Sequence, residues 1–261
     1  MISLTSAQLD AWMAAFLFPL ARILAFLSSA PVIGGKQIPT RIKIGAGVVL
    51  TIVMAPVLNI EPGIQPGSPV GLLILVEQIM AGVAMGFALR MVFAAVEMAG
   101  ELAGLQVGLG FASFYDPQHA SFTPVIAQFL GMIASLAFLA MDGHLYMLAA
   151  LAESFQAFPI STTPPSIHAW HTLVLWGGSL FAFALQLSMP LLAAMLMTNL
   201  AIGILTRSAP QLNLMSVGFP LTLGVGFVVL LLSMPYFFPL FDQFANLGIG
   251  NIIKIATQMG K

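Results

Sequence analysis

The chain has 261 residues, of which 59% are hydrophobic and 7% are charged, and its mean hydropathy is +1.02. A soluble domain carries about 25% charged residues, so this composition excludes a water-soluble protein and predicts an integral membrane protein. The net charge of −1 offers no basic surface for phosphates and excludes nucleic acid as a partner, while the absence of cysteine excludes thiol chemistry and cysteine-based metal sites.

Six apolar segments are candidates for membrane-spanning helices, because crossing the hydrocarbon takes about 20 residues of helix. Proline-containing connections separate these segments. The sequence therefore predicts an all-α, polytopic membrane protein with about six long hydrophobic helices, which cover Ala11–Ile33, Ile42–Leu58, Val70–Val96, Val125–Leu151, His171–Leu205 and Val217–Phe241.

Three of the expected helices are unusual. The third stays apolar from Val70 to about Gly108, roughly 58 Å of helix, which is too long for one simple span. The fourth is interrupted by the turn-prone triplet 142–144, and the fifth contains Gly177-Gly178 and Pro190. Partly broken helices of this kind surround a binding site or pack in a crowded assembly.

Basic residues predict the orientation of the chain. The second and fourth connections carry Glu61 and Glu153 but no Lys or Arg. The positive-inside rule therefore places the odd-numbered connections in the cytoplasm and both termini outside, although Lys254 and Lys261 in the tail run against this. The cations that support this orientation are Lys36, Arg41, Lys43, Arg90 and Arg207.

Glycines recur every four residues in the third segment. On a helix this spacing forms a smooth stripe that lets another backbone approach closely, although glycine is also simply frequent in membrane helices. We expect helix packing at Gly82, Gly86, Gly100 and Gly104.

Aromatic residues follow the last of these glycines. Phe111, Phe114 and Tyr115 come directly after Gly108 and Gly110. Bulky rings on a glycine-rich strip can occlude a channel, and packing in the core of a buried loop explains them equally well.

Charged residues on the third segment form a second pattern. Arg90, Glu97 and Glu101 share a helical face to within about 40°. Such a polar stripe lines a water-filled conduit or a subunit seam, or else it is the charged end of a helix at the interface. Glu77 lies on the opposite face and could relay protons, or else be protonated or hydrogen-bonded to a neighbouring helix. Asp142 with His144 could form a proton site, or else a turn near the outer interface.

No catalytic or metal-binding motif is present. The sequence lacks HExxH, a P-loop and GxSxG, and its four histidines show no metal-ligand spacing with acidic partners. We therefore expect no enzymatic activity, no cofactor and no metal site.

Several motifs resemble the FliR/SpaR family of type III export-gate proteins, most closely its flagellar branch. They occur in the family's order from end to end of the chain. They are Trp12, Pro19 and Arg22 with Ser28–Ile33, then Pro39–Lys43, Ala99–Glu101, Gly104–Gly108, Phe111-Ala112, Asp116-Pro117, Gly143-His144, Ala209–Asn213 and Gly218–Pro220.

This resemblance implies a pore-forming subunit of a helical, hetero-oligomeric ring in the bacterial inner membrane, within the flagellar basal body. One copy would close a ring of five FliP and four FliQ subunits through which unfolded export substrates pass. Residues 1–165 would form a FliP-like part and residues 166–261 a FliQ-like helical hairpin of one integral membrane domain that also contacts lipid.

Two segments take roles from the resemblance. The family's plug loop corresponds to Gln106, Gly108, Gly110, Phe111, Phe114, Tyr115 and Asp116. The cytoplasmic tip that meets FlhB corresponds to Arg207, Pro210, Gln211 and Asn213. The main alternative is a small ion-coupled secondary transporter that would use Glu77, Asp142 and the broken helices, but no convincing internal repeat supports it.

Overall fold

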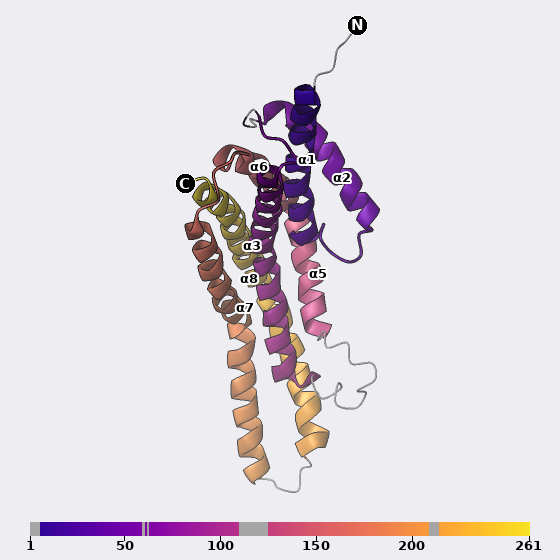
Figure 1. The fold of residues 1–261 in the computed structure, drawn as a ribbon. Coiled ribbons are helices and arrows are strands. Elements are labelled where there is room, and N and C mark those ends of the chain that lie inside the picture. The colour runs from indigo at the N-terminus through magenta and orange to yellow at the C-terminus, as the bar shows by residue number, and fades with distance from the viewer. Residues whose placement is uncertain (1–5, 59–60, 62, 110–124, 209–213) are drawn as a thin grey trace. The chain divides into compact units, whose positions relative to one another are not determined.

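The structure is a computed structural model that describes residues 6–58, 61, 63–109, 125–208 and 214–261, and this part of the chain contains helices but no strand (Figure 1). The helices are α1 (Ser6–Ser29), α2 (Thr40–Met54), the short 3-10 helix η1 (Ala55–Val57), α3 (Pro69–Val107), α5 (Val125–Ala140), α6 (Gly143–Ala157), α7 (Ile167–Ser208) and α8 (Leu214–Met259). The predicted all-α class is confirmed.

Among the described residues, four helices are long and apolar enough to cross a membrane, namely α1, α3, α7 and α8, and α5 with α6 make a fifth candidate if the broken pair counts as one span. The break between them falls where the sequence predicts it, with Asp142 in the left-handed region at φ 56°. The expected second span is shorter than predicted, because α2 has only 15 residues, about 22 Å of helix. The polytopic membrane fold is thus confirmed, and the described residues contain four or five candidate spans where the sequence predicts about six.

The described residues form two compact units. Unit 1 comprises residues 1–91, 142–178 and 245–261, and unit 2 comprises residues 92–141 and 179–244. Helices α3, α7 and α8 contribute residues to both units, and each unit is described below by itself.

In unit 1, α1 and α3 pack at the glycines of α3. A Cβ atom at Gly82 would lie 2.8 Å from the Cβ of Ala25 and 3.0 Å from the backbone nitrogen of Phe26. One turn later, a Cβ at Gly86 would lie 2.8 Å from the carbonyl oxygen of Phe26. Real Cβ atoms do not tolerate such contacts with backbone, so this approach of the two helices requires glycine at both positions.

The second and fourth connections meet within unit 1. The backbone N–H of Glu61 donates to the carbonyl of Ile160 at 3.2 Å, and the N–H of Thr162 donates to the Glu61 carboxylate at 2.9 Å. Beside this contact lies an open cavity of about 280 Å³. The sequence assigns both connections to one side of the membrane, and their contact agrees with that assignment.

The N-terminal part of α7 and the C-terminal part of α8 complete unit 1. Trp176 of α7 donates its indole N–H to the carbonyl of Ala88 on α3 at 2.7 Å, and the N–H of Ser166 donates to the carbonyl of Met259 at 3.3 Å. Apolar residues at helical spacing in the C-terminal part of α8, among them Ile252, Ile255 and Met259, are buried.

Unit 2 is organised around aromatic rings. Phe93 of α3 makes edge-to-face contacts with Phe138 of α5 at 5.5 Å and with Phe241 of α8 at 5.6 Å. Phe183 of α7 stacks on Phe244 of α8 at 4.0 Å. Edge-to-face and stacked pairs are favourable beyond their buried area, by about 0.5–1.5 kcal/mol each, so these rings join four helices.

Two long helices continue through proline residues, which usually break the helices of soluble proteins. Helix α7 runs without interruption through Pro190, and α8 contains Pro220, Pro235 and Pro239 within its 46 residues. Membrane helices tolerate interior proline because neighbouring groups satisfy the freed backbone carbonyls. Helix α8 also extends to Met259, 18 residues beyond the predicted end at Phe241, because its C-terminal part packs in unit 1.

We expect Gly86→Leu to destabilise the chain, because the new side chain would displace the backbone of α1. Overpacking of this kind typically costs about 1–3 kcal/mol. The measurement is the thermal unfolding midpoint of the detergent-solubilised chain, followed by helical circular dichroism. The control is Gly178→Leu on α7, where a Cβ would meet nothing within 4 Å. Equal midpoints for the two variants would contradict the packing requirement.

Candidate functional site

The glycines predicted to support helix packing are all on α3. Gly82 and Gly86 face α1, and in unit 2 a Cβ at Gly100 would lie 2.8 Å from the backbone nitrogen of Ala127 on α5. Gly104, one turn further, is also buried. At three of the four positions, therefore, the backbone that approaches the glycine belongs to the same chain. Whether any of them also packs against another subunit stays a prediction.

The predicted polar stripe lies on the uncovered side of α3. Arg90, Glu97 and Glu101 are each exposed, whereas their neighbours Leu89, Val96 and Gly100 are buried. Charged side chains inside the hydrocarbon are expensive unless they face water or polar partners. From Arg90 to Glu101, this side of α3 is therefore better suited to a polar environment or to the membrane interface than to the hydrocarbon interior.

Helix α3 ends where the predicted plug loop begins. Gln106 is exposed in the last turn, and Gly108 adopts φ 93° while its N–H donates to the carbonyl of Leu105 at 3.2 Å. A left-handed glycine after the last helical residue is a common way to end a helix. The remaining plug residues, namely Gly110, Phe111, Phe114, Tyr115 and Asp116, lie outside the described residues.

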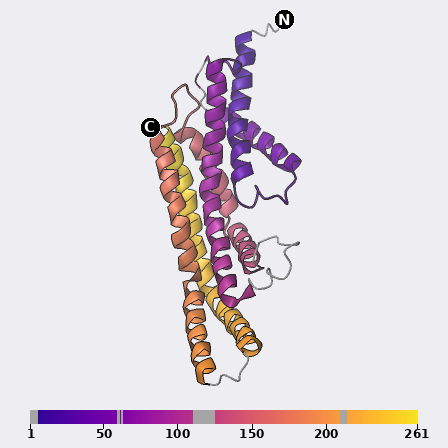
Figure 2. The ribbon, with the colours of Figure 1, turned by 60° about the horizontal axis from the view of Figure 1, so that its bottom comes forward.

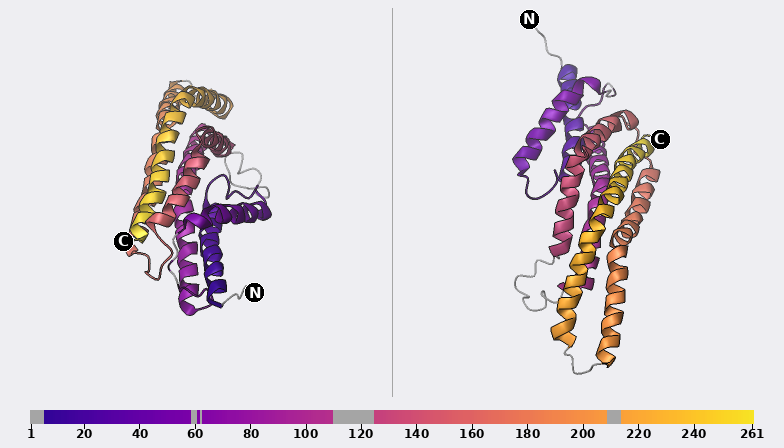
Figure 3. Two further views of the ribbon diagram at one scale, coloured as in Figure 1. Left: turned by 90° about the horizontal axis from the view of Figure 1, so that it is seen from above. Right: turned by 180° about the vertical axis from the view of Figure 1, so that it is seen from behind.

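The predicted cytoplasmic tip joins α7 to α8, which lie side by side within unit 2 (Figures 2 and 3). Arg207 is exposed in the last turn of α7, where a cation interacts favourably with the negative end of the helix dipole. The other predicted tip residues, Pro210, Gln211 and Asn213, lie outside the described residues.

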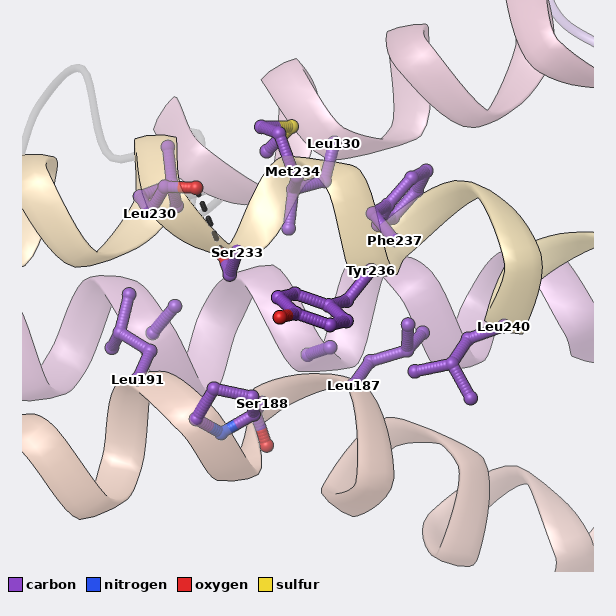
Figure 4. Close-up of a pocket in the computed structure, with 13 residues that line it drawn as sticks. Leu130, Leu187, Ser188, Leu191, Leu230, Ser233, Met234, Tyr236, Phe237 and Leu240 are labelled. Atoms are coloured by element: carbon purple, nitrogen blue, oxygen red, sulfur yellow. Dashed lines mark hydrogen bonds between the residues drawn. The ribbon is translucent and has the colours of Figure 1, made fainter.

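A small cavity of about 40 Å³ lies between the four helices of unit 2 (Figure 4). Its lining is apolar apart from a few hydroxyl groups, and two of these bond within their own helices. Ser188 donates to the carbonyl of Leu185 at 3.2 Å, and Ser233 donates to that of Leu230 at 2.8 Å. The cavity holds about one water molecule, so it is a packing gap and not a passage for a substrate.

The two groups proposed for ion-coupled transport differ in exposure. Glu77 is buried on α3, and Asp142 is exposed in the left-handed turn before α6. In the part of the chain that the structure describes, no group of three or more His, Asp or Glu residues could hold a metal ion.

Arg22 is more prominent in the structure than the sequence pattern indicates. Its side chain lies in the C-terminal half of α1 and is fully buried. Its Nε donates to Gln78 Oε1 of α3 at 2.7 Å, its Nη1 to the carbonyl of Ser154 at 3.0 Å, and its Nη2 to the carbonyl of Phe158 at 2.8 Å. Arg22 therefore connects α1 with α3 and with the C-terminal end of α6.

No carboxylate pairs with Arg22 among the described residues. Instead, its guanidinium carbon lies 4.3 Å from the ring centre of Phe155 and 5.0 Å from that of Phe158. The carbonyl end of a helix carries a partial negative charge, and aromatic faces attract cations. The sequence contained one signal for this role, namely a single arginine within an apolar segment. Such an arginine either is buried with polar partners or serves a function.

Comparison with known proteins identifies the family. Residues 13–247 match the sequence profile of the bacterial export proteins, family 1. The chain belongs to this family. It is 41% identical over 261 residues to the flagellar biosynthetic protein FliR of Pectobacterium carotovorum subsp. carotovorum, covering 99% of each chain.

Other relatives carry the same name. The chain is 39% identical to the flagellar biosynthetic protein FliR of Escherichia coli (strain K12), covering 95% of this chain and 96% of the relative. It is 28% identical to that of Bacillus subtilis (strain 168), covering 94% and 96%. The family resemblance seen in the sequence is confirmed, and the matched region includes the whole of α3, α5, α6 and α7.

We expect Arg22→Lys to lower the free energy of unfolding by about 2–3 kcal/mol, because hydrogen bonds from a charged group contribute about 1.5–3 kcal/mol. A single ammonium group cannot reach acceptors on three residues as the guanidinium fork does. The measurement is again the thermal unfolding midpoint in detergent, with Arg90→Lys as the control because Arg90 is exposed. If both variants melt alike, the hydrogen bonds of Arg22 do not hold the unit together.

Proposed function

We propose that this chain is a core subunit of the flagellar protein export gate in the bacterial inner membrane. In this proposal it closes a ring with FliP-type and FliQ-type subunits, in five and four copies, and lines the path of unfolded export substrates. It acts without catalysis or a cofactor, and its family membership supports a role in protein export.

The exposed polar stripe of α3 is the observation that carries the proposal. Arg90, Glu97 and Glu101 are exposed on a helix that is mostly apolar and largely covered, since 56% of its apolar 18-residue stretch is buried. Lipid is a poor solvent for that face. A water-filled passage or the polar seam of a neighbouring subunit would satisfy all three charges.

The hairpin of α7 and α8 supports an assembly with other subunits. Each of these helices contains an apolar stretch of 18 residues that could cross a membrane. Only 22% of this stretch is buried within the chain in α7, and only 11% in α8. Their bare apolar surfaces can pack against homologous helices as well as against lipid, and neighbouring FliP-type and FliQ-type subunits would cover them in a ring. The ion-coupled transporter has no comparable support, because the family is one of export proteins.

The plug can be tested by replacing its aromatic residues with alanine. We expect the triple variant of Phe111, Phe114 and Tyr115 to raise the leakage of ions and small molecules through the assembled complex, because three rings that fill the channel are lost. The measurement is conductance or dye efflux in reconstituted vesicles. The matched control replaces Phe16, Phe129 and Tyr146, which are exposed on α1, α5 and α6. Unchanged leakage from a fully assembled complex would remove the plug from the proposal.

The tip can be tested by cross-linking, because the chain contains no cysteine of its own. We expect Ser208→Cys, at the exposed end of α7, to form disulfides with cysteines placed along the cytoplasmic loop of the FlhB-type subunit in native membranes. Glu153→Cys, on an exposed position of α6, is the control and should not cross-link. Labelling of residue 208 by an impermeant reagent from outside would contradict both the contact and the orientation.

A further inference from the structure

Helix α2 has one covered face and one bare face. Its buried residues are Gly47 and Thr51, and a Cβ at Gly47 would collide with the side chain of Leu24 on α1. At 100° per residue, Ile42, Val49 and Val53 lie on the opposite side of the helix. These three side chains are 60%, 60% and 66% exposed. Figure 3 shows α2 at the periphery of unit 1, in contact with α1 on one side.

The bare face has the length of one membrane leaflet. From Ile42 to Val53 the helix rises about 16 Å, and the hydrocarbon core of a bilayer is about 30 Å thick. The apolar stripe therefore matches the acyl chains of a single leaflet and does not reach across the membrane.

One end of this stripe is strongly basic. Lys36 and Arg41 are exposed, and Lys43 is half-buried. No Asp or Glu occurs between Asp10 and Glu61 to neutralise them. The positive charge is confined to the N-terminal end of α2, and the opposite end of the helix carries none.

Lys43 shapes the turn that presents the other two cations. Its ammonium group donates to the carbonyls of Gly34 and Gly35 at 2.8 and 3.0 Å. The same turn contains Val32 at φ 61°, a conformation that β-branched residues rarely adopt. The bonds of Lys43 fix this turn, and the side chains of Lys36 and Arg41 stay free to meet a ligand from outside.

From this arrangement we infer that the α1–α2 corner binds an anionic phospholipid, with the phosphate group at Lys36 and Arg41 and the acyl chains along Ile42, Val49 and Val53. An ammonium and a guanidinium group are suited to a lipid phosphate, and the anionic cytoplasmic leaflet attracts basic segments next to the membrane. The positive-inside rule places this corner in that leaflet. A zwitterionic lipid would meet the same apolar face without the favourable net charge.

The test uses one fluorescent label on the bare face. Val49→Cys, labelled with bimane, is reconstituted together with its co-purified partner subunits in phosphatidylcholine vesicles. Brominated phosphatidylglycerol or brominated phosphatidylcholine is then titrated in. We expect phosphatidylglycerol to be preferred at the label by about five-fold, the effect of roughly one basic residue at a membrane surface. The preference should weaken as salt is added.

A pair of matched double variants decides the result. K36Q with R41Q should bring the preference close to one, whereas K254Q with K261Q removes the same charge at the exposed C-terminal end and should leave it unchanged. Equal quenching by both lipids in the parent chain, or a preference that survives K36Q and R41Q, would overturn the inference. Absence of quenching by either lipid would show that protein covers the face, and would overturn it as well. Export activity is not read out, so a failed lipid preference would leave the proposed function standing.

Discussion

A buried cation, which has no carboxylate partner among the described residues, connects three helices of unit 1. Burying an isolated charge costs several kcal/mol, so Arg22 is tolerable only because the surrounding structure replaces its hydration. Two carbonyls at the end of α6, the amide of Gln78 and two aromatic faces supply that replacement. These partners come from α3 and from α6 with the residue that follows it, so α1, α3 and α6 must all be in place before the charge is satisfied.

The glycines of α3 make this arrangement possible. Gly82 faces the backbone carbonyl of Arg22, and Gln78, which accepts from the Arg22 side chain, precedes Gly82 by one helical turn. Residues four apart share a helical face, so the glycine and the hydrogen bond belong to the same contact. A side chain at residue 82 would separate the helices and lengthen the bond to Gln78. The close approach of α1 and α3 and the hydrogen bonding of the Arg22 charge therefore depend on one another.

The sequence predicts what depends on local chemistry and misses what depends on packing partners. The excess length of α3, its end near Gly108 and the break at Asp142 follow from apolar runs and turn residues. By contrast, α8 continues past Asp242 because Ile252, Ile255 and Met259 find partners in unit 1, although their helical spacing was visible in the sequence. The apolar run 42–58 predicts a membrane span, but α2 has only 15 residues. Hydropathy measures how apolar a segment is, and it does not show whether lipid or a neighbouring helix covers that segment. The role of Arg22 depends on carbonyls 132 and 136 residues away, which no local pattern reveals.

The distribution of charge indicates which surfaces need other partners. Arg22 is buried although it lies in the first apolar segment, where lipid could otherwise have reached it. Arg90, Glu97 and Glu101 lie on a helix that is at least as apolar but are left uncovered. The chain buries the charge of Arg22 among polar partners and does not expose it to lipid. Three exposed charges on a neighbouring helix are therefore difficult to reconcile with a surface that faces lipid. The contrast supports the proposal that this face of α3 meets water or another subunit, and that the isolated chain is one part of a larger assembly.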